Sequence, residues 1–426
     1  MRVLCTATGA PSHGRALLPL VRALAGDGHE VTVVATEAIA PLLSGTDGIG
    51  LRTSMPVLPR LRAPGRASAP GDMTARFRVR VAQLTGPYAL EVLDVLRGVA
   101  RERRPDVVLR HGMDLGSCLL AEELGVPHLP VPCGFVNLAD PVAMLPALNG
   151  LRAEVGLPAR DDPASLYPYG RLDYVPPEYS FAGSPIPVLA YRQSTPVETT
   201  ALPSWVARLP SGPPLVFASV GTSLPVIRNG SPDGHMPEGL TDPATQLRTI
   251  IAALSQLDVV AVVATAGIDL GGVEPGPNVH LIDRVAQPLL LECADLLVTH
   301  GGYNSVSEAL RTATPMVVVP NFADQPHNAR RVQEIGLGRS LTDPTPHALA
   351  AMCRDLLDDA ATAARLRAAR LAVLALPDIT RAPADLADIV AAAGQSGAES
   401  SAMNWWATED VPPSATSAPV SRVEGG

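Results

Sequence analysis

The sequence predicts an α/β protein with two successive halves, each built around a parallel β-sheet. Apolar runs of strand length alternate with segments of helical periodicity over residues 2–132, and the same alternation begins again at residue 214. Residues 158–214, which separate the two halves, are dense in proline and aromatic residues. The length of 426 residues fits two domains of ordinary size.

The first half opens with a strand, a loop over residues 9–14 and a helix over residues 15–28, in which Leu17, Leu20 and Leu24 recur at helical spacing. A strand follows directly, and a β-α-β unit of this kind implies parallel pairing. Residues 50–90 are rich in Pro, Gly and Arg and are predicted to be irregular. The strands expected in this half are residues 2–8, 29–36, 105–111 and 126–132, with a helix near 116–125.

The second half repeats the pattern. Its expected strands lie within residues 214–223, 259–266, 278–285, 296–302 and 314–320, with helices near 244–256, after 302 and after 325. Ligands of parallel sheets bind at the carboxyl ends of the strands, so we expect a binding cleft between the two halves.

These patterns predict an N-terminal domain over residues 1–205 and a C-terminal domain over residues 213–380. A helix over residues 381–396 is expected to pack back on the N-terminal domain. Residues 397–426, rich in Ser, Pro and Gly, are expected to be disordered. Trp405 and Trp406 in this tail have no role that the sequence explains.

Composition excludes several function classes. The sequence contains no lysine, which rules out a Schiff-base lysine, a pyridoxal-phosphate anchor and a Walker-A lysine. The net charge of −9 argues against nucleic acid or an anionic membrane as the main partner. The five cysteines are scattered without a CxxC pair, so neither a disulfide framework nor a zinc site is expected. With no long apolar run and no secretory signal, we expect a cytoplasmic protein.

The most informative stretch is VTHGGYNSVSEAL, residues 298–310, which indicates a strand, a Gly-rich turn and a helix start. A helix N-terminus offers free N–H donors and about half a positive charge, and Gly301 and Gly302 let phosphate oxygens approach the backbone. His300, Asn304 and Ser305 add polar groups at the same turn. An ordinary strand-to-helix connection capped by Asn or Ser has the same appearance.

Three further patterns extend this hypothesis to a whole nucleotide sugar. Asp324 and Gln325 stand side by side after a strand, where a carboxylate and an amide can hold vicinal sugar hydroxyls. Ser219, Thr222 and Ser223 follow the first strand of the second half and offer donors to a phosphate. Val285 and Gln287 lie in a turn whose backbone could contact a nucleobase. Each pattern alone is equally typical of a polar turn or helix cap.

The segment THGGYNSVSEALRTATPMVVVPNFADQPHNARRV resembles the donor-binding signature of the UDP-glycosyltransferase superfamily. The segment HGRALLPLVRALAGDGHEVTVVAT resembles the N-terminal signature of the same family, and bacterial natural-product and macrolide glycosyltransferases of actinobacteria are the most similar subgroup. The resemblance covers residues 1–390. It implies the GT-B fold, with two facing Rossmann-like domains, inversion at the anomeric carbon and catalysis without a metal ion or other cofactor.

The resemblance also implies roles for individual residues of the donor site. His300, Gly302, Asn304 and Ser305 would contact the donor phosphates, Glu308 the ribose, and Asp324 and Gln325 the sugar hydroxyls. Val285 and Gln287 would meet the base. Arg284 stands where the family often has an aromatic residue, which leaves the choice between a UDP-sugar and a TDP-sugar open.

The family's catalytic base matches His13, although Ser12 replaces the usual glycine and Ala16 a common proline. An imidazole with a pKa near 6.5 suits general base catalysis on an acceptor hydroxyl. Such a base usually has an acidic partner. Asp114 is the candidate, while the most usual position of the acid falls on His111, so both stay open. Residues 55–90 and 133–150 are predicted to be irregular segments that line an apolar aglycone pocket.

The sequence therefore predicts an inverting glycosyltransferase that uses a small hydrophobic aglycone. Two alternatives stay open: a GT-B-fold nucleotide-sugar epimerase and a non-catalytic partner protein of the same fold. The aglycone, the sugar and the nature of the attacking atom are undetermined, as is whether the chain is a monomer or a homodimer.

Overall fold

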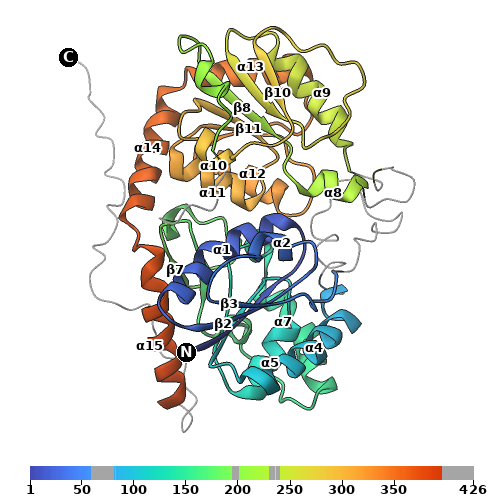
Figure 1. Ribbon diagram of the computed structural model, residues 1–426, viewed down its shortest axis with the longest axis vertical. Helices are drawn as coiled ribbons and strands as arrows, with labels where there is room; N and C mark the ends of the chain where they lie inside the picture. Colours follow the sequence, from blue (N-terminus) through green and yellow to red (C-terminus); the bar gives the residue numbers. More distant parts are fainter. Residues whose placement is uncertain (59–80, 82, 194–200, 230–235, 237–239, 396–426) are drawn as a thin grey trace, which may run out of the picture.

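The computed structural model of the chain describes residues 1–58, 81, 83–193, 201–229, 236 and 240–395. The predicted tail with Trp405 and Trp406 lies outside the described residues, and so do residues 59–80 and 82 of the predicted irregular segment. Two α/β units are stacked in the described part, with the N-terminal unit below and the C-terminal unit above in Figure 1.

The first sheet is parallel throughout and has the strand order β3-β2-β1-β4-β5. Val3 of β1 pairs with Val31 on one side and with Val107 on the other, so β1 lies in the centre. Its strands are β1 (Arg2–Ala7), β2 (Glu30–Ala35), β3 (Ile49–Arg52), β4 (Val107–Arg110) and β5 (His128–Pro130). The short strand β3 and its pairing were not predicted.

Helices cover both faces of this sheet, as a parallel sheet requires. They are α1 (Pro11–Gly26), α2 (Ala40–Leu43), α4 (Pro87–Arg103), α5 (Gly116–Leu124), α6 (Gly134–Leu138) and α7 (Pro141–Glu154). Val3 and Cys5 pack in one apolar core with α1, whereas Leu4 packs in another with α4 and α5. The alternation of side chains along β1 thus separates two helical layers.

Two segments predicted to be irregular contain helices. Within residues 50–90, Gly86 and Pro87 begin α4, whose apolar face then runs on to Ala100. Within residues 133–150, Asp140 caps α7 by accepting hydrogen bonds from the N–H groups of Val142 and Ala143. Proline at the first helical position and a carboxylate cap are both helix-start signals. The prediction of irregular structure for 133–150 was therefore wrong.

The second sheet is also parallel throughout and has the order β10-β9-β8-β11-β12-β13. Its strands are β8 (Leu215–Ser219), β9 (Val260–Ala264), β10 (Val279–Ile282), β11 (Leu296–Thr299), β12 (Met316–Val318) and β13 (Gly338–Ser340). Its helices are α8 (Ser223–Asn229), α9 (Pro243–Leu254), α10 (Gln287–Leu290), α11 (Tyr303–Thr312), α12 (Gln325–Glu334) and α13 (Pro346–Leu357). The predicted fold class, two Rossmann-like α/β halves with parallel sheets, is confirmed.

The connecting segment and the last helices join the two units. The connection holds β6 (Arg171–Asp173) and β7 (Val188–Ala190), which pair in parallel, and the short 3₁₀ turns 163–166, 177–179 and 206–208. Helices α14 (Ala360–Ala375) and α15 (Ala382–Gln395), in red, run along one side of the molecule from the second unit to the first (Figure 1). Leu386 and Ile389 of α15 enter the core of α1. The exact domain boundaries stay a prediction.

Candidate active site

Each sheet has one point at which the strand order reverses, and several of the residues predicted from the sequence follow the strands at these two points. In the first sheet the point lies between β1 and β4, which lead to His13 and His111. In the second it lies between β8 and β11, where Ser219 pairs with Thr299, so that Gly221 and His300 come next. Ligands of open α/β sheets bind at such points.

His13 lies in the first turn of α1 and not in a loop, because α1 begins at Pro11. Its ring nitrogen Nδ1 lies 2.7 Å from the carbonyl oxygen of Thr8, so the Nδ1–H donates to that carbonyl and Nε2 is free to accept a proton. Gly9 has φ +91°, and a Cβ there would lie 2.5 Å from His13 Nδ1. The ring position therefore depends on a glycine two residues after β1. Burial lowers the pKa of His13, and the hydrogen bond to Thr8 opposes this shift.

The neighbour of His13 is a second imidazole. The rings of His13 and His111 stack with centroids 4.6 Å apart. Nδ1 of His111 accepts from the N–H of Met113, while its buried Nε2 has no hydrogen-bond partner among the described residues. Burial, together with the nearby His13 and Arg110, lowers the pKa of His111 well below its ordinary value. His111 thus supplies a neutral ring surface beside the imidazole of His13.

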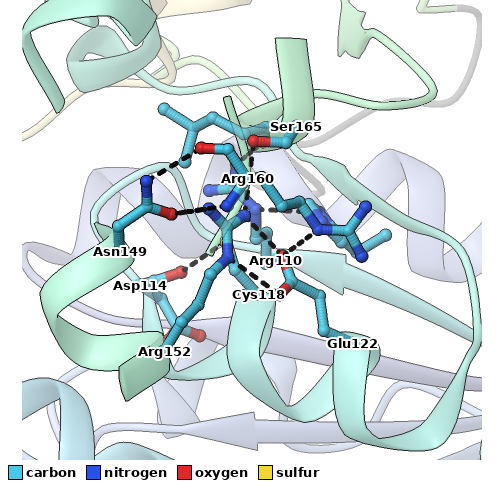
Figure 2. A network of polar contacts seen from close by, with 10 residues as sticks. Arg110, Asp114, Cys118, Glu122, Asn149, Arg152, Arg160 and Ser165 are labelled. Atoms are coloured by element: carbon cyan, nitrogen blue, oxygen red, sulfur yellow. Dashed lines mark hydrogen bonds and ion pairs between the residues drawn. The ribbon is translucent and has the colours of Figure 1, made fainter. Parts of the chain in front are cut away.

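Asp114 has other contacts. Its carboxylate accepts hydrogen bonds from the hydroxyl of Thr6 at 2.7 Å and from the N–H of Ser117 at 2.9 Å, and the Ser117 hydroxyl also donates to it. Among the described hydrogen bonds, none joins Asp114 to His13. Figure 2 shows Asp114 beside a buried polar network that includes Arg110 and Arg152. Burial raises the pKa of Asp114, and its hydrogen bonds oppose the shift. The carboxylate of Asp114 thus joins Thr6 of β1 to Ser117 of α5, and its role as the acidic partner of His13 stays a prediction.

This placement predicts the effect of Asp114→Asn. The amide keeps the shape but loses one acceptor for the hydroxyls of Thr6 and Ser117, so the free energy of unfolding should fall by about 1–3 kcal/mol. Because Thr8 orients His13, the turnover number of the folded enzyme should change by less than about threefold. Urea unfolding and initial rates measure the two quantities. A loss of turnover on the order of 10⁴-fold, as expected for removal of the orienting acid of a His base, would instead assign Asp114 to His13.

The Gly-rich turn leads into α11 as predicted. Gly301 has φ +83°, and a Cβ there would lie 2.5 Å from Val318, while Gly302 is the N-cap residue and leaves the first turn of α11 without a side-chain cap. The ring of His300 lies between Gly221 and Gly302, since a Cβ at either position would lie within 2.6 Å of the ring. Burial lowers the pKa of His300 to about 4, so the ring is a neutral donor at pH 7.

The other donor-site candidates lie around the same turn. Gly221 N–H donates to the hydroxyl of Ser219 at 3.1 Å, Thr222 is exposed and Ser223 begins α8. Gln287, at the start of α10, donates to Glu308 at 2.6 Å and to Ser305 at 3.3 Å. These contacts bring together the residues predicted for base, phosphate and ribose. Val285, just before Gln287, packs at the edge of the apolar core.

Asp324 and Gln325 begin α12 next to this turn. Gln325 Oε1 accepts from the N–H groups of Asn321 and Phe322, so its carbonyl is engaged in shaping the loop. The carboxylate of Asp324 accepts from Asn328 at 2.7 Å, and a Cβ on Gly134 of α6 would lie 2.0 Å from Asp324 Oδ2. Glycine at position 134 thus gives the carboxylate room against the first unit. Burial raises the pKa of Asp324 to about 6.

The raised pKa of Asp324 predicts a dependence of stability on pH. The carboxyl titrates near 3.9 in the unfolded chain and near 6 in the folded protein, so the folded state binds more protons between these values. The stability that this group contributes is therefore lost as pH rises from about 4 to about 6. Asp324→Asn should melt at a higher temperature than the wild type at pH 8, with a difference that shrinks toward pH 4. The exposed Asp343→Asn is the control, and a difference equal at all pH values would contradict the prediction.

Two hydrogen bonds join the candidate base helix to the candidate donor helix. The side-chain amide of Asn304 donates to the carbonyl of Ser12 at 2.8 Å, and Arg15 NH2 donates to Glu308 Oε1 at 2.9 Å. The carboxyl ends of the two sheets therefore face each other across α1 and α11. Arg15 and Gly134 were not predicted as site residues, because their partners Glu308 and Asp324 belong to the other half of the chain; Gly9 was not predicted either.

A cavity of about 520 Å³ lies elsewhere, between residues 177–188 and the outer face of α12. Arg171, His327 and Arg330 are among its lining residues, and none of the predicted site residues is. In the described part of the chain, no helix is long and apolar enough to cross a membrane. No cluster of three or more His, Cys, Asp or Glu side chains suited to a metal ion occurs among the same residues.

Comparisons with known proteins identify the family. The family model described as "Erythromycin biosynthesis protein CIII-like, C-terminal domain" matches residues 248–391, which include Gln287 to Gln325. Zeaxanthin glucosyltransferase of Pantoea ananas is 27% identical over 90% of this chain and 94% of its own length. L-demethylnoviosyl transferase of Streptomyces niveus is 28% identical over 81% of this chain and 86% of its own.

The fold agrees with that of a solved glycosyltransferase. The solved structure of the glycosyltransferase VinC in complex with DTDP superposes with a TM-score of 0.67 at 23% identity, over 92% of this chain and 100% of that chain. The resemblance seen in the sequence is thereby confirmed. The chain is a glycosyltransferase of the natural-product type with the GT-B fold, and its residues 248–391 match the erythromycin CIII-like C-terminal domain model.

Proposed function

We propose that the protein transfers a sugar from a TDP- or UDP-sugar to a hydroxyl group of a small hydrophobic natural-product aglycone, with inversion at the anomeric carbon and His13 as general base. One observation carries the proposal: the carbonyl of Ser12, the residue before His13, accepts a hydrogen bond from Asn304 in the first turn of α11. The candidate base and the candidate phosphate-binding turn therefore lie side by side.

The imidazole of His13 has the state that a general base needs. Its Nδ1–H donates to Thr8, so Nε2 carries the lone pair, and its lowered pKa keeps the ring neutral at pH 7. In the transfer step the acceptor oxygen forms a bond to the anomeric carbon as the bond from that carbon to the diphosphate oxygen breaks. The bonding electron pair leaves with the diphosphate, and the acceptor proton moves to His13 Nε2.

The donor is proposed to lie along α11 and α12. The uncapped first turn of α11, the neutral His300, Asn304 and Ser305 would donate hydrogen bonds to the diphosphate, as expected for a site that stabilises developing negative charge. Ser219, Thr222 and Ser223 are the proposed donors from the neighbouring loop. Glu308 would bind the ribose, and Val285 and Gln287 the base. VinC, crystallised with DTDP, supports a thymidine nucleotide as the first candidate.

The sugar and the aglycone are proposed to meet at α6. Asp324 and Gln325 would hold the sugar hydroxyls, and Gly134 of α6 packs against the carboxylate of Asp324. The aglycone would therefore bind against the N-terminal unit, near α6 and α7. The relatives act on chemically different substrates, as the names zeaxanthin glucosyltransferase and L-demethylnoviosyl transferase indicate, so the aglycone and the sugar are left to experiment.

The test combines nucleotide binding with product analysis. Thermal melting is measured with TDP, UDP and several of their sugars, for the wild type, Asn304→Ala and the control Ser307→Ala on the same helix. A ligand at a hundredfold excess over its dissociation constant stabilises the protein by about 2.7 kcal/mol. We expect a shift with one nucleotide that is lost in Asn304→Ala and kept in Ser307→Ala. NMR of the glycoside should show the anomeric configuration opposite to that of the donor.

The other outcomes decide against the proposal in different ways. The absence of a shift with either nucleotide would remove the donor site from the Gly-rich turn. An epimerised sugar nucleotide, formed without an acceptor product, would identify an epimerase. Tight donor binding without turnover across a broad acceptor panel would indicate a non-catalytic protein. A glycoside with retained configuration would contradict the direct displacement assisted by His13.

A further inference from the structure

The residues predicted for the donor site include no positively charged side chain, although the leaving group is a nucleoside diphosphate. The diphosphate gains negative charge as the sugar departs, yet His300 is neutral at pH 7, and Asn304 and Ser305 are uncharged. The remaining charged residues proposed for the site, Glu308 and Asp324, are carboxylates. The chain has no lysine, so any side chain with a permanent positive charge must be an arginine. A cation at the diphosphate would balance the developing charge.

Arg15 is an arginine that contacts a proposed donor-binding residue, Glu308. It lies on α1 two residues after His13, and its NH2 group is 2.9 Å from Glu308 Oε1. The ion pair is largely shielded from solvent, with side-chain exposures of 22% for Arg15 and 11% for Glu308. The buried Nε of Arg15 has no hydrogen-bond partner among the described residues. The guanidinium therefore has unused donor capacity inside the site.

The register of the two helices places this guanidinium close to the phosphate-binding turn. Ser12 and Arg15 are three residues apart on α1, and their partners Asn304 and Glu308 are four residues apart on α11. Residues at these spacings share one face of a helix. Glu308 is thus one helical turn, about 5.4 Å, from Asn304 along α11. A helical turn of this length is within the reach of a long, flexible arginine side chain, so the proposal requires no movement of α1.

We propose that Arg15 binds the diphosphate of the donor and stabilises it as it leaves. This inference rests on the function proposed above. When the ribose hydroxyls occupy the carboxylate of Glu308, the guanidinium of Arg15 turns from Glu308 to the diphosphate oxygens, for which its planar, bidentate geometry is suited. His13 and Arg15 stand on the same turn of α1. One helix of the N-terminal unit therefore brings both the base and the compensating charge to the donor.

The experiment compares Arg15→Gln and Arg15→Lys with the wild type. Titration calorimetry measures the affinities for TDP and TMP, or for UDP and UMP if the wild type prefers uridine. Arg15→Gln should lower the preference for the diphosphate over the monophosphate by about tenfold or more, since it removes a charge-assisted contact to the second phosphate. It should lower the turnover number by about 10²-fold. Arg15→Lys keeps the charge and should recover part of both losses.

A purely structural role predicts other results. If Arg15 only joins the two units, Arg15→Gln would change the affinities for both nucleotides by the same factor and leave the preference for the diphosphate unchanged. That result would overturn the proposal, even with a lower melting temperature. Arg101→Gln, at an exposed position on α4, is the control for the loss of one charge. If the wild type bound none of these nucleotides, both the proposed function and this inference would be wrong. If the wild type bound them and Arg15→Gln kept the wild-type preference for the diphosphate over the monophosphate, only the role of Arg15 would be wrong.

Discussion

His13→Ala is expected to lower the turnover number for sugar transfer by about 10³-fold, within the range that a positioned general base contributes. The affinity for TDP or UDP should stay within about twofold, because the nucleotide is proposed to bind along α11. Initial rates with the accepted aglycone and calorimetric titration with the nucleotide measure these two effects. A fall in turnover number with unchanged nucleotide affinity indicates loss of the base, whereas a fall in both would indicate damage to the donor site.

The matched control for this prediction is His347→Ala, an exposed histidine on α13 that should retain wild-type kinetics. Because burial lowers the pKa of His13, the wild type should lose turnover only below the ordinary histidine range as pH falls. If His13→Ala kept full transfer activity with normal donor binding, the proton would have to go to another acceptor, and the proposed mechanism would be wrong.

Among the variants proposed here, Glu122→Ala is expected to lose the most stability, about 3 kcal/mol of unfolding free energy. The reason is that the buried positive charge of Arg152 would be left without a carboxylate partner. Arg152 is fully buried and donates to both oxygens of Glu122, at 2.9 and 2.7 Å, within the network shown in Figure 2. Asn149 and Ser165 also accept from this guanidinium but carry no charge. The loss corresponds to a fall in melting temperature of about 10 °C for a domain of this size.

Arg160→Ala is the control within the same network. Arg160 is 50% exposed and lies 3.8 Å from Glu122, so its removal should change the unfolding free energy by less than about 1 kcal/mol. Both variants should keep their affinity for nucleotide when folded, since the network lies away from α11. A fall in melting temperature of less than about 2 °C for Glu122→Ala corresponds to a loss of roughly 1 kcal/mol or less in unfolding free energy. That result would show that the hydrogen bonds from Arg152 to Asn149 and Ser165 are sufficient to stabilise its buried charge.

The regular part of the fold could be predicted from the sequence because it depends on local apolar pattern. The strands β1 and β9 are rich in apolar residues, and the predicted ranges 2–8 and 259–266 contain them with at most two extra residues at either end. The strand β13 was not predicted. Gly338–Ser340 has no apolar run, and it forms a strand only because Val317 of β12 offers an open edge to Arg339. Edge pairing of this kind depends on contacts that are distant in the sequence.

The helices α4 and α7 were missed for a different reason. Both begin at a proline, which also ends regular elements, and residues 50–90 around the start of α4 are rich in Pro, Gly and Arg. The N–H group at the first helical position has no partner within the helix, so proline there costs no hydrogen bond. Proline can therefore begin a helix as well as end one. The apolar face of α4 then packs on Leu4, an anchor more than eighty residues away in the sequence.

Within the candidate site, the sequence located the residues but not their partners. It selected His13 and expected a carboxylate to orient it, whereas Thr8 uses its backbone carbonyl, an acceptor that every residue possesses and that no pattern can distinguish. It selected Asn304 and Glu308 as ligands of the donor, whereas in this structure both contact α1. The fit of Gly134 against Asp324 could not be predicted either, since the two residues are 190 positions apart.

The sequence by itself determined the fold class, the family resemblance and the side chains available for chemistry, because apolar period, glycine position and the order of polar residues are local properties. Only the tertiary structure decided which atoms these side chains use. It placed His111 against His13, Asp114 within hydrogen-bond distance of Thr6, and Arg15 beside Glu308. The physical reason is that hydrogen bonds and ion pairs depend on distances of a few ångströms between segments that only the packing of two sheets brings together.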